Sequence, residues 1–323
     1  MAAKRLRKNR LAPAGQGTDR APAIKFADIG TLFGFLAMTP LAWFVPRRHW
    51  HRIGSLLSPL IARIEGMAGA DAVTARVAGV YRDREHSMSP RRIVARYRSG
   101  HFEEFLNILR CYRPWQPVPD CTLAGGEHLT AALEKGQGAV LWIDDFHPYS
   151  LISKVALFQA GFRSIHLSHP AHGFSRTRFG MAVINPVKIR AEDKWLAERV
   201  FMGHDGALVA LRTLRKRLRD NAIVSITAGP SAQQPVRLKF LEGTLALATG
   251  APDLAFMAKA PLLPLHTVQR EDGRFEVTIE KPIEAERGSD RQAFSEKAAR
   301  EYSERLEPVV LSHPHQWRGW SQN

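Results

Sequence analysis

Two carboxylates and an imidazole crowd into four consecutive positions directly after a short apolar run. The run covers residues 139–143, and Asp144, Asp145 and His147 follow it. A carboxylate beside an imidazole, whose ordinary pKa is about 6.5, can move a proton near neutral pH. This pattern makes the three residues candidate catalytic groups. The alternative is that Asp144 or Asp145 only caps the helix that follows.

The elements on either side predict where these residues lie. The apolar run at 139–143 is typical of a strand buried inside an α/β sheet. Pro148 fits the first turn of a helix, and apolar residues then continue at helical spacing until Gly161. Open α/β sheets bind their ligands where a strand ends and a helix begins. We therefore expect the candidate residues at the mouth of a binding site.

The rest of the chain predicts an α/β protein with a mixed central sheet flanked by helices. Further strands are expected over residues 163–168, 221–227, 261–268 and 274–279, the last two as a hairpin. Helices are expected from Ser89-Pro90 onward, over 192–219, over 245–258 and over 290–311. We expect a disordered basic arm at 1–23, helical membrane-anchoring elements at 24–112 and an α/β domain at 113–323.

Composition narrows the class of partner. The 323 residues include 46 Lys and Arg against 31 Asp and Glu, a formal net charge of +15. Such a balance favours an anionic partner: nucleic acid, an acidic membrane surface or an acidic carrier protein. A nucleic-acid partner is not expected, because no base-reading motif is present. Cys111 and Cys121 are the two cysteines, and the sequence shows no residues at metal-ligand spacing, so we expect no metal.

An uncharged run over residues 29–45 bears on the choice between the remaining partners. As a helix it would be about 25 Å long, slightly shorter than the hydrocarbon core of a bilayer. Basic residues flank it on both sides, and an amphipathic helix with a basic face is expected over residues 50–64. These features predict a membrane-inserted or re-entrant anchor. The alternative is a buried core helix.

Several motifs, taken in order, resemble those of the bacterial lipid A (lauroyl/myristoyl) acyltransferases of the lysophospholipid acyltransferase superfamily. They are the apolar anchor, the strand–turn–helix at 138–151, the arginine-bearing segment 174–180 and the segments 239–248 and 261–264. The ending at 313–320, with its His-Pro-x-Gln-Trp pattern, is the most specific of them. The resemblance covers roughly residues 28–320 and implies a glycerolipid-acyltransferase-like fold.

The resemblance also implies a reaction and a place. A fatty acyl group would pass from acyl carrier protein or coenzyme A to a membrane lipid such as lipid A. The reaction would take place at the cytoplasmic face of a bacterial inner membrane and would use no cofactor. By the same resemblance the substrate-binding residues would be Arg176, Arg178, Lys239, Gly243 and Thr244.

The catalytic loop departs from the family pattern. The family carries a His that takes the proton and, five positions later, a carboxylate that orients it. Alignment through Phe146 places Asp145 and Ser150 at these two positions. In one interpretation His147 acts as the base and Asp144 or Asp145 orients it. In another, the protein is catalytically inactive and binds only a lipid or a carrier. A different alignment of the loop is a third interpretation.

Overall fold

The computed structural model describes residues 21–65, 70–84, 86–115, 118–147, 149–169, 172–202, 207–230, 235–286 and 288–321. The basic arm predicted at the N-terminus lies outside these residues, except for its last three positions.

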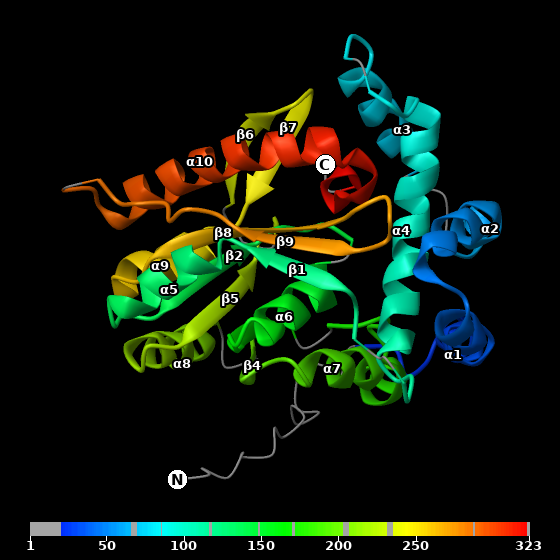
Figure 1. Cartoon of the computed structure of the whole chain (residues 1–323), viewed down its shortest axis with the longest axis horizontal. Helices are drawn as coiled ribbons and strands as arrows, with labels where there is room; N and C mark the ends of the chain where they lie inside the picture. Colours follow the sequence, from blue (N-terminus) through cyan, green and yellow to red (C-terminus); the bar gives the residue numbers. More distant parts are fainter. Residues whose placement is uncertain are drawn as a thin grey trace.

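A seven-stranded mixed sheet forms the centre of the molecule, in the order β1-β9-β8-β2-β5-β3-β4 (Figure 1). β2 pairs in parallel with β5 and β8, and β3 pairs in parallel with β4 and β5. β8 and β9 form an antiparallel pair, and β1 is parallel to β9. The carboxyl ends of β2, β3, β5 and β8 therefore share one edge. The strands are β1 (Cys121–Ala124), β2 (Ala139–Ile143), β3 (Ser164–Ser168), β4 (Glu198–Phe201), β5 (Ile223–Thr227), β8 (Leu262–Gln269) and β9 (Phe275–Ile279).

Helices cover both faces of this sheet. One face packs against α8 (Ala207–Arg219), α9 (Gly250–Ala258) and α10 (Arg291–Ser312). The other packs against α5 (Gly126–Glu134) and α6 (Tyr149–Gln159). Every residue of β2 is buried, as expected for a central parallel strand that is covered on both sides. The predicted α/β class with its mixed sheet is thus confirmed.

The N-terminal helices lie beside the carboxyl edge of the sheet. They are α1 (Phe26–Phe44), α2 (Trp50–Glu65), α3 (Ala70–Val80) and α4 (Pro90–Arg110), with the short helix η1 (Arg47–His49) before α2. α4 stands against the edge, and α1 and α2 pack on its outer side (Figure 1). Pro90 occupies the first turn of α4 after Ser89, as the sequence predicted.

Two predicted elements are wrong. Residues 192–219 do not form one helix: α7 (Asn185–Asp193) ends first, and β4 then adds an edge strand in which Val200 is buried. Residues 245–247 belong to a strand and not to a helix. They end β7 (Gly243–Leu247), which pairs with β6 (Val236–Phe240) as a separate hairpin. The run at 245–247 was mistaken for a helix because a short apolar run fits a strand as well as a helix. The strand at 198–201 was missed because half of its residues are charged, so it carries no continuous apolar run.

Candidate active site

The loop after β2 reaches the edge that α4 covers, and the C-terminal segment holds it there. This segment contains η4 (Pro314–Gln316) and η5 (Arg318–Ser321). The backbone N–H of His147 donates to the Gln316 carbonyl at 2.8 Å, and Phe146 forms a backbone bridge with Trp317. The Gln316 side chain both accepts from and donates to the backbone of Gln269, each at 2.7 Å. The His-Pro-x-Gln-Trp ending therefore positions the candidate loop.

Asp144 points into the protein. Its Oδ2 accepts hydrogen bonds from the Thr267 backbone at 3.1 Å and lies 3.3 Å from Nδ1 of His266. Burial raises the pKa of this carboxyl, and the contacts with His266 and Thr267 oppose the rise. His266 also lies 3.5 Å from Glu280. Asp144 is thus placed beside an imidazole of β8.

Asp145 faces the C-terminal segment. Its Oδ1 lies 3.6 Å from Nε of Arg318, and its backbone carbonyl accepts from the Arg318 N–H at 2.9 Å. This contact joins the loop to η5. The three candidate catalytic residues therefore share one loop, but their side chains face three different neighbours.

His147 packs against α4. Its ring lies 4.5 Å from the ring of His101 and 5.2 Å from that of Tyr97, measured between centroids. Neither ring nitrogen has a hydrogen bond to a described side chain. Burial, reinforced by the nearby His101 and Arg318, holds the pKa of His147 well below its ordinary value. The imidazole is neutral, which makes it able to accept a proton but a weak base.

A small cavity of about 20 Å³ adjoins this ring, lined among others by His147, Gly100 and Glu104. A space of that size holds about one water molecule. His101, Glu104 and His147 also bring three possible metal-ligating atoms within 4.8 Å of one another. Glu104 is already bound by Lys188 at 2.7 Å and by Arg318 at 3.3 Å. These two cations would repel a divalent ion, so the set fits a metal poorly.

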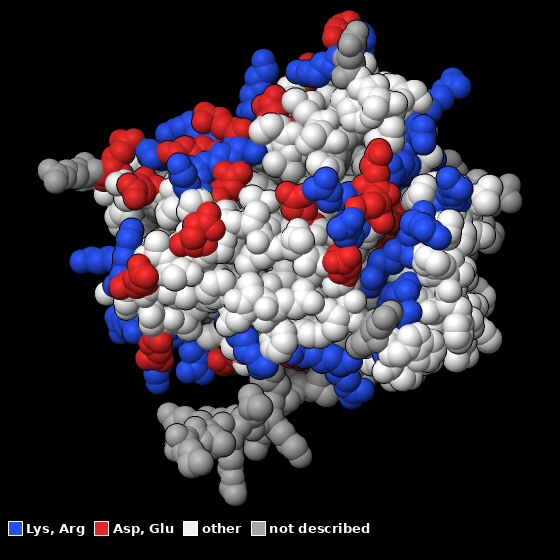
Figure 2. Space-filling view, viewed as in Figure 1, with Lys and Arg blue, Asp and Glu red and all other residues white. Residues whose placement is uncertain are grey.

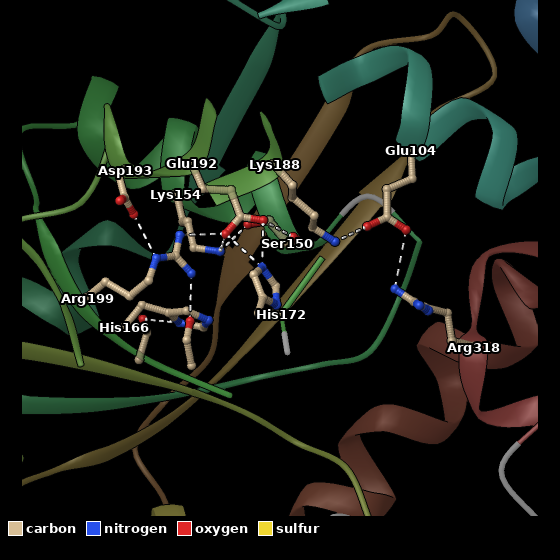
Figure 3. Close-up of polar contacts among 12 residues, drawn as sticks. Glu104, Ser150, Lys154, His166, His172, Lys188, Glu192, Asp193, Arg199 and Arg318 are labelled. Atoms are coloured by element: carbon tan, nitrogen blue, oxygen red, sulfur yellow. Dashed lines mark hydrogen bonds and ion pairs between the residues drawn. The ribbon is translucent and has the colours of Figure 1, made fainter. Parts of the chain in front are cut away.

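A second polar cluster centres on Glu192 of α7, whose side chain is fully buried (Figure 3). Lys154 of α6 lies 3.1 Å and Arg199 of β4 lies 2.8 Å from its Oε2, and both cations are themselves buried. Burial alone would raise the pKa of Glu192, but Lys154, His172 and Arg199 hold it well below its ordinary value. Glu192 is therefore ionised.

Two further groups complete this cluster. Nε2 of His172 lies 3.1 Å from each carboxylate oxygen of Glu192. The hydroxyl of Ser150 donates to Oε1 of the same carboxylate. Position 150 is where the family resemblance places a carboxylate. In this chain the carboxylate beside position 150 is that of Glu192, which belongs to α7.

The predicted substrate-binding residues fall into two separate groups. Arg176 and Arg178 are exposed, and their segment contacts the start of α1, where the Arg178 N–H donates to the Pro22 carbonyl. Lys239, Gly243 and Thr244 are exposed on the hairpin of β6 and β7.

The hairpin, unlike the arginine segment, connects to the candidate loop through aromatic side chains. The ring of Phe240, at the end of β6, lies 5.3 Å from the ring of Trp317, measured between centroids. The backbone of Trp317 in turn pairs with that of Phe146 in the candidate loop. The structure thus places the hairpin that carries Lys239, Gly243 and Thr244 against the C-terminal segment that holds the candidate loop, whereas the segment of Arg176 and Arg178 contacts the N-terminal helices.

The C-terminal two thirds of the chain match a known protein family. Residues 116–322 match the family described as bacterial lipid A biosynthesis acyltransferase. No curated protein matches the chain. Among solved structures, the 1-acyl-sn-glycerophosphate (LPA) acyltransferase PlsC from Thermotoga maritima is similar at 13% identity and a TM-score of 0.37. That alignment covers 83% of this chain and 98% of the other.

Proposed function

The chain belongs to the bacterial lipid A biosynthesis acyltransferase family, and from that premise we propose that it transfers a fatty acyl group from an acyl thioester to a membrane lipid. The observation that carries the proposal is the family match over residues 116–322. This span includes the whole seven-stranded sheet and the polar loop at its carboxyl edge. Ligand binding at such an edge is the general behaviour of open α/β sheets.

The reaction needs a group that takes a proton. A hydroxyl or amine of the lipid attacks the thioester carbon, loses its proton, and the carbon–sulfur bond breaks. The sequence hypothesis assigns the proton to His147, oriented by Asp145 or Asp144. Supporting it, the ring is neutral and adjoins a cavity of about 20 Å³. Weighing against it, its exposed fraction is only 4% and its basicity is lowered by burial.

We extend the proposal to the partners that the sequence suggests. The donor would be acyl carrier protein or coenzyme A, and the acceptor would be a lipid at the cytoplasmic face of the inner membrane, such as lipid A. The second candidate function is a catalytically inactive protein that binds a lipid or carrier. It is favoured by Asp145 and Ser150, which stand where the family resemblance places the His and the carboxylate.

Mass spectrometry of lipids tests this function. We expect a strain that lacks the gene to contain a lipid lighter by one fatty acyl chain. Purified protein, supplied with acyl carrier protein or coenzyme A thioesters of the same fatty acid, should restore the missing chain in a lipid extract. An unchanged lipid profile, together with binding of membrane lipid by the purified protein, would favour the inactive binding protein instead.

Helix α1 supports a membrane location and suggests its geometry. It is long and apolar enough to cross a bilayer. However, both ends are fastened to the body: Asp28 accepts from the hydroxyls of Ser175 and Thr177, and Trp43 donates to the Leu109 carbonyl. A helix held along α4 cannot cross a bilayer without the body. We therefore propose that residues 24–112 dock the α/β domain, residues 113–323, onto the membrane with α1 lying in its plane.

The outward face of α1 is suited to this docking. Phe26, Phe33, Leu36 and Phe44 recur at helical spacing and are 68–87% exposed. In Figure 2 the lower right of the molecule, where α1 lies, shows few charged side chains, with Lys and Arg along its border. Apolar side chains inside a basic border are typical of a helix in the headgroup region.

We expect the double variant Phe33→Glu/Leu36→Glu to bind vesicles of anionic phospholipid at least about tenfold more weakly. The reason is that burial of each such side chain contributes about 1.5–3 kcal/mol when complete. Vesicle sedimentation measures this binding. The matched control is Leu208→Glu/Val209→Glu on α8, two exposed apolar residues remote in sequence from α1. Equal losses in both variants would contradict docking through α1. Substitution is preferable to deleting residues 1–46, because deletion uncovers Leu106 and its apolar neighbours.

A further inference from the structure

We propose that His172, held by Glu192, is the proton acceptor in acyl transfer. The inference rests on the proposed function and names a residue that the sequence hypothesis did not choose. It starts from the carboxylate of Glu192, which Nε2 of His172 contacts through both oxygens, at 3.1 Å each.

The contact defines the chemistry of the ring. Because Glu192 is ionised, Nε2 of His172 must carry the hydrogen that points between the two oxygens. In the neutral ring the lone pair then lies on Nδ1, and Nδ1 is the atom that accepts a proton. Glu192 fixes the tautomer and also stabilises the positive charge that forms when the proton arrives.

The surroundings keep His172 neutral before the reaction. Burial lowers its pKa, Glu192 opposes this, and Lys188 and Lys154 lower it further. Arg199 and Asp193 complete the charges around Glu192, since Arg199 pairs with both acids at 2.8 and 2.7 Å. Glu192 itself is held in place by Lys154, Arg199 and the Ser150 hydroxyl. The base is therefore both available and oriented.

Position and access distinguish His172 from His147 and from His266. It lies in the segment after β3, whose carboxyl end shares an edge with that of β2. Its side chain is 17% exposed, whereas that of His266, the partner of Asp144, is 4% exposed. His147 is buried and lacks a hydrogen bond to a described carboxylate. Of the three, His172 combines a bonded carboxylate with access from outside.

The proposed step conserves atoms and charge. The lipid oxygen forms a bond to the thioester carbon while its proton passes to Nδ1 of His172. The tetrahedral intermediate then collapses, the carbon–sulfur bond breaks, and the departing thiolate takes the proton from the imidazolium. The products are the acylated lipid, the free thiol of the donor and a neutral His172, ready for another cycle.

The test compares three Gln variants of the full chain with dodecanoyl-coenzyme A, dodecanoyl acyl carrier protein and a bacterial lipid extract. Gln can still donate to a carboxylate, but it cannot take up a proton. We expect His172→Gln to lower kcat by about 10²–10⁴ with little change in KM. The control is His128→Gln on α5, which should retain the parent rate. His147→Gln tests the sequence hypothesis in the same assay.

Two further readouts separate catalysis from structure. Added imidazole should restore part of the rate to His172→Ala and none to His172→Gln. In the parent, kcat/KM should fall at acid pH, because protonation of His172 removes the base. The fall should come at a lower pH than for an ordinary imidazole, because burial lowers the pKa of His172. A large loss in His147→Gln with an unchanged rate in His172→Gln would overturn this inference alone. A parent inactive with both donors would overturn the proposed function and this inference together.

Discussion

Replacing Glu192 by Ala is expected to cost about 3–5 kcal/mol of folding free energy, the cost of removing one partner from a buried ion pair. The side chains of Lys154 and Arg199 are 1% and 2% exposed, and both would lose their main counter-charge. A domain is typically stable by only about 5–15 kcal/mol, so much of the variant should be unfolded or aggregated. Urea unfolding followed by circular dichroism measures the loss.

Glu198→Ala provides the matched control. Glu198 pairs with Arg217 at 2.8 Å, but the two side chains are 31% and 38% exposed. An exposed ion pair contributes about 0–1 kcal/mol, so this variant should unfold close to the parent. Similar losses of unfolding free energy for Glu192→Ala and Glu198→Ala would show that burial does not determine how much the Glu192 cluster contributes to stability.

The pKa of Glu192 also predicts how the stability of the folded protein changes at acid pH. Its pKa in the folded chain lies well below the value of 4.5 expected when it is unfolded. The stability that it contributes is therefore complete above about pH 4.5 and is lost as the pH falls toward the folded value. The parent protein should lose stability progressively below that pH.

The sheet and the position of the loop were predictable because their signals are local. The apolar run of β2 and Ser89-Pro90 at the start of α4 each depend on a few neighbouring residues. Pro148, which the sequence predicts in the first turn of the next helix, lies outside the described residues. The hairpin of β8 and β9 was likewise predicted by its turn and is confirmed. The error at 245–247 concerns a short apolar run, where periodicity does not separate strand from helix. The error at 198–201 concerns a strand in which Glu198 and Arg199 hide the apolar signal.

The partners of the candidate residues were not predictable in the same way. Asp144 binds His266 and Thr267, which lie more than 120 positions later in the chain. The register of β2 beside β8 decides that contact, and one sequence does not reveal register between distant strands. A carboxylate next to His147 in the sequence therefore did not imply a carboxylate next to it in space.

The Glu192 cluster did leave one signal in the sequence. Lys154 lies among Leu151, Ile152 and Val155, on a helix whose apolar residues continue all round. A lysine in such a helix implies a buried counter-charge, because an unpaired buried charge is costly. Its partner comes from α7, and no spacing rule points from Lys154 to Glu192.

Gly100→Ala is expected to destabilise the protein by about 1–3 kcal/mol, although alanine normally stabilises a helix relative to glycine. Gly100 lies within α4, where α4 meets His147. A Cβ at this position would lie 2.3 Å from Cδ2 and 2.6 Å from Cγ of the His147 ring. The rings of Tyr97 and His101 already flank that imidazole, so either the ring or α4 must shift.

Gly79→Ala is the control, because a Cβ there meets nothing within 4 Å. It should stabilise the protein by about 0.4–1 kcal/mol, the ordinary gain of alanine over glycine in a helix. The double variant Gly100→Ala/His147→Ala tests the cause directly by thermal unfolding. If the close approach of α4 to the ring determines the loss, the double variant should be more stable than the sum of its single variants predicts. Simple additivity would mean that Gly100 matters for a reason other than His147, and that α4 does not hold this imidazole in place.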